Sequence, residues 1–166
     1  QGVCSRFRWI QPGSFMMGSP TSKLQRGGNE TLHDVTLTQG FWMADTACTQ
    51  ALWLAVMGSN PAYFSSNFEN PVEKVSWNDV QLFLQRANDL VSTKGGLRLP
   101  SEAEWEYACR AGTNTPFSFG SNATPALANC RGNYPSGGDN DGLYREKTIP
   151  VKSLHTNRWG LYQMHG

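Results

Sequence analysis

The sequence predicts an α+β domain in which short strands and two well-capped helices are set among much irregular structure. Its 166 residues include 17 glycines and 9 prolines, and both residue types interrupt periodic structure. Two capping signals open helices in the middle of the chain, whereas residues 113–150 show no sustained period. A chain of this length buries roughly two thirds of its unfolded surface, so we expect one core.

Short strands are expected near the start of the chain. Residues 7–10 and 15–18 flank Pro12-Gly13, a strong turn signal, so we expect these two segments to form a hairpin. Residues 19–30 are polar and predict a loop. Residues 35–38 alternate apolar with polar side chains, which is typical of a half-buried strand.

A short helix and a longer one follow. Residues 49–57 place apolar side chains at helical spacing, and Gly58 closes that helix. The clearest helix begins at Ser76, whose hydroxyl can cap free backbone N–H groups while Asp79 completes the capping box. Apolar residues then recur at steps of three and four, and Gly95-Gly96 terminates the helix.

A third helix begins at Ser101, where Glu104 supplies the acidic partner of a second capping box, and it ends near Gly112. Residues 113–150 are rich in Gly, Asn, Pro, Ser and Asp and predict irregular but ordered structure. The sequence contains no internal repeat and no low-complexity linker, so we expect a single domain spanning residues 1–166.

The two capped helices also predict the core, because each needs an apolar surface to cover. We expect this core to contain Trp77, Phe83, Leu84 and Trp105. The Tyr107 side chain is expected to pack there as well.

Composition argues against several classes of protein. The net charge is +1 and 16% of residues are charged, with no long run of either sign, so we expect no nucleic-acid partner. No stretch approaches the roughly 18 apolar residues needed to cross a bilayer. No targeting segment follows Gln1. We expect a soluble protein without a membrane span, and the compartment stays open.

Four cysteines stand at Cys4, Cys48, Cys109 and Cys130, and none has the C-x-x-C spacing that lets two thiolates grip one metal. We expect free or buried thiols, and a disulfide of unassigned pairing remains the alternative. The three histidines lack the H-x-x-x-H spacing of a helical zinc site, which argues against zinc.

Three glutamates at 102, 104 and 106 suggest an acid–base cluster at first sight. Alternate residues of a helix lie about 200° apart, so neighbouring members of the trio Glu102, Glu104 and Glu106 do not share a face. We expect capping and solvent-exposed roles for them. The G-x-S-x-G frame of a nucleophilic serine and the G-K-S/T end of a phosphate-binding loop are both absent from the sequence.

Several strings, in order, closely resemble the formylglycine-generating-enzyme or sulfatase-modifying-factor family. They are PGSFMMGS at 12–19, VTL at 35–37, TQALW at 49–53 and NPVEKVSW at 70–77. The most specific string is LRLPSEAEWEYA at 97–108, followed by IPV at 149–151 and WGLYQMHG at 159–166. Their shared order and spacing, rather than any single string, identify the resemblance.

The resemblance implies a C-type-lectin-like architecture with extra loops and short twisted strands. Family members continue from the last string into an Asn-x-Trp-Glu-Trp segment and then into a region with the cysteine pair that binds copper. Neither follows here, so we expect a formylglycine-generating-enzyme-type domain that lacks its C-terminal part and needs that remainder as a partner. None of the four cysteines matches the catalytic pair, so we expect no catalytic or copper-binding residue in this chain.

The glycine-rich stretch near residues 129–143 offers oxygen ligands of the kind that Ca²⁺ prefers. From composition alone, turns that use Asn, Asp and Gly are the favoured explanation of the stretch. The family resemblance implies a structural calcium bound by the side chains of Asn129 and Asp141 and by the carbonyls of Cys130 and Leu143.

The resemblance implies a bacterial-type oxidoreductase whose intact form oxidises a cysteine of a sulfatase-type protein or peptide substrate to formylglycine, using oxygen and copper. The alternative is a non-catalytic, lectin-like module on the same fold that binds an unknown ligand or serves as an accessory domain, because a fold does not dictate a function. The sequence leaves open whether the parent protein is an enzyme.

Overall fold

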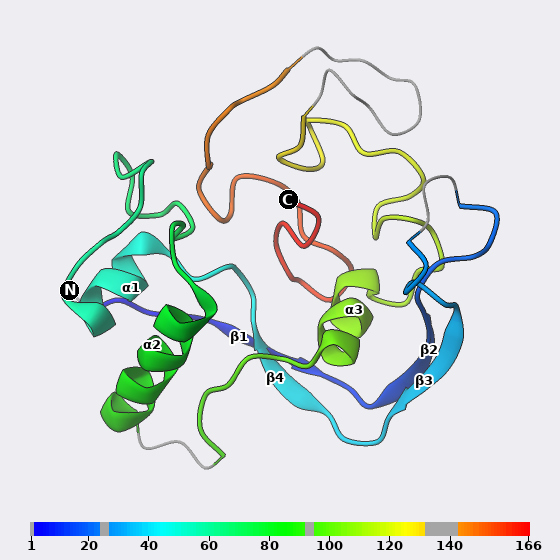
Figure 1. Cartoon of the computed structure of the whole chain (residues 1–166), viewed down its shortest axis with the longest axis horizontal. Coiled ribbons are helices and arrows are strands. Elements are labelled where there is room, and N and C mark those ends of the chain that lie inside the picture. Colours follow the sequence, from blue (N-terminus) through cyan, green and yellow to red (C-terminus); the bar gives the residue numbers. More distant parts are fainter. Residues whose placement is uncertain (1, 24–26, 92–94, 132–142) are drawn as a thin grey trace.

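The computed structural model describes residues 2–23, 27–91, 95–131 and 143–166 (Figure 1). The elements in chain order are β1 (Phe7–Ile10), β2 (Gly13–Met17), β3 (His33–Leu37), β4 (Phe41–Ala44), α1 (Gln50–Met57), α2 (Trp77–Leu90) and α3 (Glu102–Arg110). Turns and irregular segments make up most of the remaining described chain. The expected mixture of short strands, helices and irregular structure is confirmed.

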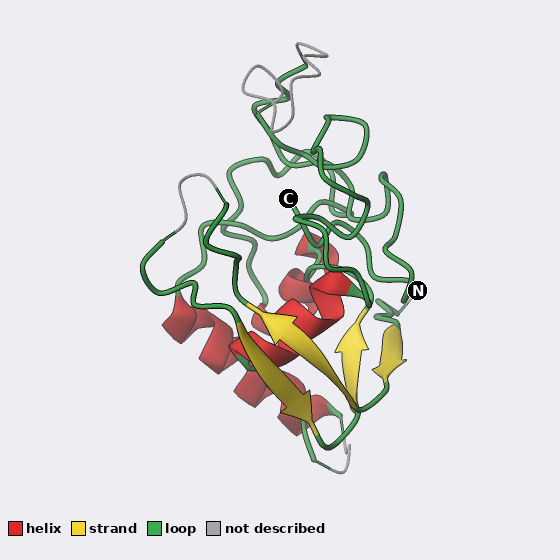
Figure 2. Ribbon diagram, turned by 90° about the vertical axis from the view of Figure 1, so that its right-hand side faces the viewer, coloured by secondary structure: helices red, strands yellow, loops and turns green. Residues whose placement is uncertain are grey.

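The four strands form two antiparallel two-stranded sheets, which follow each other along the chain as a bent ribbon (Figure 1). β1 pairs with β4, with Trp9 opposite Trp42, and β2 pairs with β3, with Phe15 opposite Val35. Two residues join β1 to β2, whereas three join β3 to β4, and an unequal count of this kind bends a ribbon as a β-bulge does. Figure 2 shows the strands in front of the helices, with the irregular loops gathered at one end.

The expected hairpin between residues 7–10 and 15–18 is wrong. β1 and β2 follow each other along one side of the ribbon and pair with β4 and β3 instead. Gly13 does not form the predicted hairpin turn. Its lack of a side chain matters instead, because a Cβ atom there would collide with the Tyr107 hydroxyl. The glycine therefore allows α3 to approach β2. The expected strand at 35–38 is confirmed in β3.

The helices begin at the predicted caps. Thr49 caps α1, Ser76 caps α2 and Ser101 caps α3, and the last two complete full capping boxes. α1 ends at Gly58, which has a left-handed conformation, and α2 ends at Leu90, before the predicted glycine pair. Among the helices in the described ranges, none combines the length and apolar character needed to cross a bilayer.

One buried cluster lies between α1 and α2 and is called the α1–α2 cluster. Its buried residues are Trp53, Phe83 and Ala87. The Trp53 and Phe83 rings stack with centroids 5.0 Å apart and planes inclined by 4°. Leu84 packs against this cluster, so the expected core positions of Phe83 and Leu84 are confirmed.

A second buried cluster, called the α3 cluster, joins β1, α3 and the end of the chain. Its buried residues are Ile10, Tyr107, Ala108 and Leu161. The Tyr107 ring lies 4.8 Å from the Trp159 ring, centroid to centroid, so α3 packs directly against the irregular C-terminal segment.

Two of the expected core residues are exposed instead. Trp77 is 68% exposed and Trp105 is 44% exposed. Trp105 lies two residues from buried Tyr107, and that spacing points the two side chains to opposite sides of α3. Trp77 opens α2 about 120° from Phe83, on the face that carries Gln81. Both tryptophans are apolar, which is why the sequence predicts them in the core. Their positions on α2 and α3 direct their side chains away from the buried face of each helix.

Candidate functional site

The start of the predicted calcium loop is tied to two other segments. Asn129 Nδ2 donates to the Lys147 carbonyl at 3.0 Å, and the Asn129 backbone N–H donates to the Gly166 carbonyl at 3.2 Å. Residues 129, 147 and 166 therefore meet, although they are far apart in sequence. Asn129 itself is half-buried.

The structure brings two of the four predicted calcium ligands to one cavity of about 280 Å³, which Asn129 and Cys130 line together with Glu146. Leu143 is 47% exposed and does not line this cavity. Asp141 lies outside the described residues. Glu146 is a carboxylate that sequence reasoning missed, because nothing in the spacing of residues 129 and 146 predicts that they meet.

Asn129, Cys130 and Glu146 offer oxygen atoms of the kind that calcium takes, and the cationic residues Arg131 and Lys147 line the same cavity. The Asn129 amide nitrogen already donates to Lys147, which leaves its Oδ1 atom as the possible ligand. Cys130 can contribute its backbone carbonyl. Such uncharged oxygens, together with carboxylates, are the ligands that Ca²⁺ takes in proteins.

Two of the four cysteines are poorly suited to binding copper as thiolates. Cys4, Cys48, Cys109 and Cys130 are all free thiols. Burial raises the pKa of Cys48 and that of Cys109 to about 11, so both thiols stay protonated at neutral pH. Within the described residues, no group of three or more His, Cys, Asp or Glu side chains is placed to hold a metal ion.

Cys109 and His165 form a buried contact that the sequence did not suggest. The Cys109 sulfur lies 3.7 Å from Nδ1 and 3.6 Å from Nε2 of His165, while the Ser118 backbone N–H donates to Nε2 at 2.9 Å. Nearly equal distances place the sulfur beside the ring rather than in line with one nitrogen, unlike the directed bond of a nucleophilic Cys–His pair.

His165 therefore acts as a half-buried hydrogen-bond acceptor through Nε2. Burial, with a smaller contribution from the Arg110 charge, lowers the pKa of His165. The residues of this contact are 47 and 56 positions apart in sequence, so no local motif could have revealed it.

The glutamates of α3 have separate partners. Glu104 accepts from both terminal nitrogens of Arg98 at 2.6 and 2.7 Å, and this contact, against a smaller effect of burial, lowers the pKa of Glu104 to about 2. Glu106 instead accepts from Arg110 at 2.6 Å. The expected capping role of Glu104 is confirmed, and the two carboxylates form no acid–base pair.

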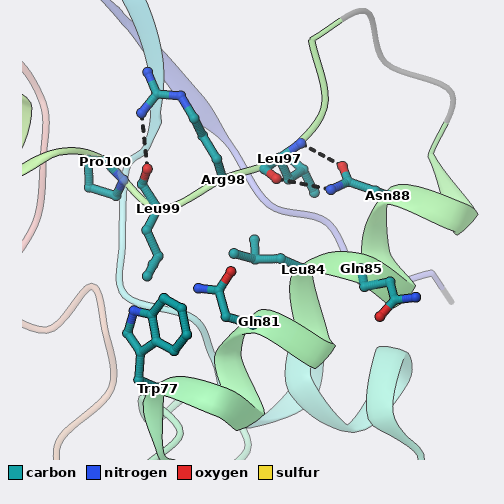
Figure 3. Close-up of a pocket in the computed structure, with 9 residues that line it drawn as sticks. All are labelled: Trp77, Gln81, Leu84, Gln85, Asn88, Leu97, Arg98, Leu99 and Pro100. Atoms are coloured by element: carbon teal, nitrogen blue, oxygen red, sulfur yellow. Dashed lines mark hydrogen bonds between the residues drawn. The ribbon is translucent and has the colours of Figure 1, made fainter.

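A groove of about 560 Å³ lies between α2 and the segment 97–100 (Figure 3). Trp77, Gln81 and Gln85 line the helix side of the groove. The Asn88 side chain bonds both the N–H and the C=O of Leu97, which holds the segment beside α2. Trp77, Gln81 and Gln85 are four residues apart, so the sequence indicates that they share one face of α2. The prediction that Trp77 belongs to the core hid this face.

Residues 3–166 match the family described as sulfatase-modifying factor enzyme 1-like domain. The mouse formylglycine-generating enzyme is 37% identical over 127 residues, which are 69% of this chain and 32% of that protein. The Streptomyces coelicolor formylglycine-generating enzyme is 30% identical over 161 residues, which are 90% of this chain and 48% of that protein.

A bovine protein named inactive C-alpha-formylglycine-generating enzyme 2 is also similar, with 31% identity over 121 residues, or 70% of this chain and 36% of that protein. The chain thus spans between about a third and a half of the length of these three relatives.

Solved structures share the fold. PvdO from Pseudomonas aeruginosa has a TM-score of 0.79 and 28% identity, covering 98% of this chain and 68% of PvdO. Treponema denticola variable protein 1 has a TM-score of 0.69 at 24% identity, covers 95% of this chain and 68% of its own, and is evidence for the fold alone. The resemblance seen in the sequence strings is confirmed, and the chain belongs to the sulfatase-modifying factor enzyme 1-like domain family.

Proposed function

We propose that the protein carrying this domain oxidises a cysteine of a sulfatase-type polypeptide to formylglycine. The observation that carries the proposal is the 37% identity with the mouse formylglycine-generating enzyme over 127 residues. Since the chain spans 32% of that relative, the proposal concerns the whole protein and gives this domain a supporting role.

The proposed reaction balances with oxygen and an external thiol reductant. The cysteine Cβ loses its bond to sulfur and one bond to hydrogen, and it gains a double bond to one atom of O₂. The sulfur leaves as hydrogen sulfide and the second oxygen atom leaves as water. Two molecules of the thiol supply two protons and two electrons and become a disulfide.

Copper is the metal that the resemblance implies for oxygen activation. Burial disfavours the thiolate form of half-buried Cys48 and of buried Cys109, so we assign no residue of this chain to copper. What the described residues supply is a folded support, with α3 joining the strand ribbon to the C-terminal segment.

We also propose that calcium stabilises the loop that begins at Asn129. Asn129 and Cys130 line one cavity, and Asp141 and the Leu143 carbonyl complete the proposed ligand set. Calcium should raise the thermal midpoint of the protein, and Asn129→Ala should abolish this rise. Asn122→Ala, in an exposed part of the same segment, should leave the rise unchanged. A rise that survives Asn129→Ala would contradict this ligand set.

A second candidate function is a non-catalytic binding module. It is favoured by the similarity to a bovine relative named as inactive. On this alternative, the same fold would recognise a ligand without changing it.

The two candidates separate in one experiment. The full-length protein, loaded with copper, is incubated in air with a thiol reductant and a sulfatase peptide that contains the target cysteine. Mass spectrometry and an aldehyde-reactive hydrazide probe should detect formylglycine, and the serine version of the peptide is the control. An unmodified cysteine peptide that nevertheless binds would favour the binding module.

A further inference from the structure

We propose that the groove between α2 and residues 97–100 binds an extended, uncharged polypeptide segment. The inference rests on the proposed function, because it names the part of the domain that would hold a polypeptide. It concerns binding alone and includes no chemical step.

The helix side of the groove combines an exposed indole with neutral amides. Trp77 is 68% exposed, although it is the first residue of a helix whose other face is packed. Gln81 and Gln85 follow at steps of four, so they continue the line of Trp77 along one side of α2. An indole offers a large apolar contact, and each glutamine offers both donors and an acceptor. Figure 3 shows the Trp77 ring and the Gln81 amide facing the segment that forms the other side.

The opposite side of the groove is backbone that is suited to a strand-like partner. Leu99 precedes Pro100, which restricts Leu99 to extended conformations. Arg98 and Leu99 are exposed, and in the described part of the chain their backbone N–H groups have no hydrogen-bond partner. In an extended segment successive N–H groups point to opposite sides, and the Leu97 N–H bonds Asn88 on α2, so the Leu99 N–H faces the groove and can pair with the main chain of an added peptide. Asn88 keeps this segment in place through its two bonds to Leu97.

Charge decides the chemistry of the occupant. Of the described residues that line the groove, Arg98 alone is charged, and Glu104 neutralises it through a two-nitrogen contact. The remaining polar lining consists of amides. A peptide with Lys, Arg, Asp or Glu facing the groove would lose solvation without gaining an ion pair. A neutral peptide with a Leu or aromatic side chain over Trp77 meets both the apolar and the amide groups.

Binding is tested with the full-length protein and an end-blocked peptide of alternating Leu and Thr, which contains no cysteine. Its affinity is measured by calorimetry, and Trp77→Ala should weaken it about tenfold or more, as loss of a central aromatic contact does. The matched control is Trp42→Ala, because Trp42 on β4 is 64% exposed and lies outside the groove. Equal affinity in the Trp77→Ala protein and the unsubstituted protein would overturn the proposal.

A second measurement does not depend on a substitution. Hydrogen exchange at the Leu99 amide should slow when the peptide is added, because its N–H group gains a partner. Unchanged exchange at saturating peptide, or preferential binding of a neutral oligosaccharide, would also overturn the proposal. Peptide binding without formylglycine formation would support the groove and contradict the oxidase, whereas formylglycine formation without groove binding would contradict the groove alone.

Discussion

The α1–α2 cluster and the α3 cluster are built in different ways. The first is apolar packing between two helices, with the stacked Trp53 and Phe83 rings at its centre. The second gathers Ile10, Tyr107 and Leu161 from a strand, a helix and an irregular segment. Helix periodicity is enough to assemble the first cluster, whereas the second needs polar contacts that hold an irregular backbone in position.

Asn157 supplies those polar contacts. Its Nδ2 donates to the carbonyl of Ala108 at 2.8 Å and to that of Cys109 at 3.3 Å, near the end of α3. Its Oδ1 accepts from the backbone N–H groups of Trp159 and Leu161 at 3.0 and 3.2 Å. One amide side chain thereby satisfies the end of the helix and shapes the segment that delivers Leu161 to the core.

The largest expected effect is in the α1–α2 cluster. Phe83→Ala should lower the free energy of unfolding by about 3 to 5 kcal/mol, because it leaves a cavity against Trp53. Urea denaturation measures the change. Leu82→Ala is the control, since Leu82 is the neighbouring residue of α2 and is 40% exposed. Equal losses in the two variants would show that the cluster is not packed as described.

A smaller but still large loss is expected at the polar link of the α3 cluster. Asn157→Ala leaves backbone groups near the end of α3 and in residues 159–161 unpaired, so it should lower the free energy of unfolding by about 2 to 4 kcal/mol. Asn157→Asp keeps the acceptor but places a carboxylate oxygen against the Ala108 and Cys109 carbonyls, so its loss should be at least as large. Asn122→Ala, at an exposed asparagine, is the control. If Asn157→Ala lowers the free energy of unfolding by less than this control does, the α3 cluster does not depend on polar contacts.

The N-terminal caps of α2 and α3 should contribute equally to the free energy of unfolding, although the two helices belong to different clusters. Ser76→Ala at the start of α2 and Ser101→Ala at the start of α3 should each lower the free energy of unfolding by about 1 kcal/mol. Both serines complete the same capping box, so the packing behind each helix should not change the value. Ser65→Ala, in an exposed loop, is the control for denaturation. A much larger loss at one cap would show that the cap and the cluster behind it are coupled.

The smallest expected effect is a pH dependence confined to the α3 side. Burial, with a smaller contribution from the Arg110 charge, lowers the pKa of His165 below its ordinary value of 6.5. The resulting stability is present above pH 6.5 and is lost as the pH falls from there to the lowered pKa. Thermal midpoints between neutral and mildly acidic pH measure it. His165→Gln should reduce the change of the thermal midpoint with pH. If His33→Gln removes this change and His165→Gln does not, the pH dependence does not come from His165.

Local signals in the sequence were enough for the helices. The Ser76 and Ser101 capping boxes depend on residues three positions apart, so the sequence contains both partners side by side. The same local reasoning failed for Trp77 and for the pairing of β1, because a side chain's burial and a strand's partner depend on segments distant in the chain. The family strings were readable because they are contiguous.

The sequence by itself determined the helix starts, the Phe83 side of the α1–α2 cluster and, through its strings, the family. Only the tertiary structure decided that β1 pairs with β4, that Asn129 meets Lys147 and Gly166, and that Trp77 faces a groove. The physical reason is the range of the interactions. Caps and helical periodicity act within a few residues, whereas pairing, cavities and buried polar contacts form only when distant parts of the chain pack together.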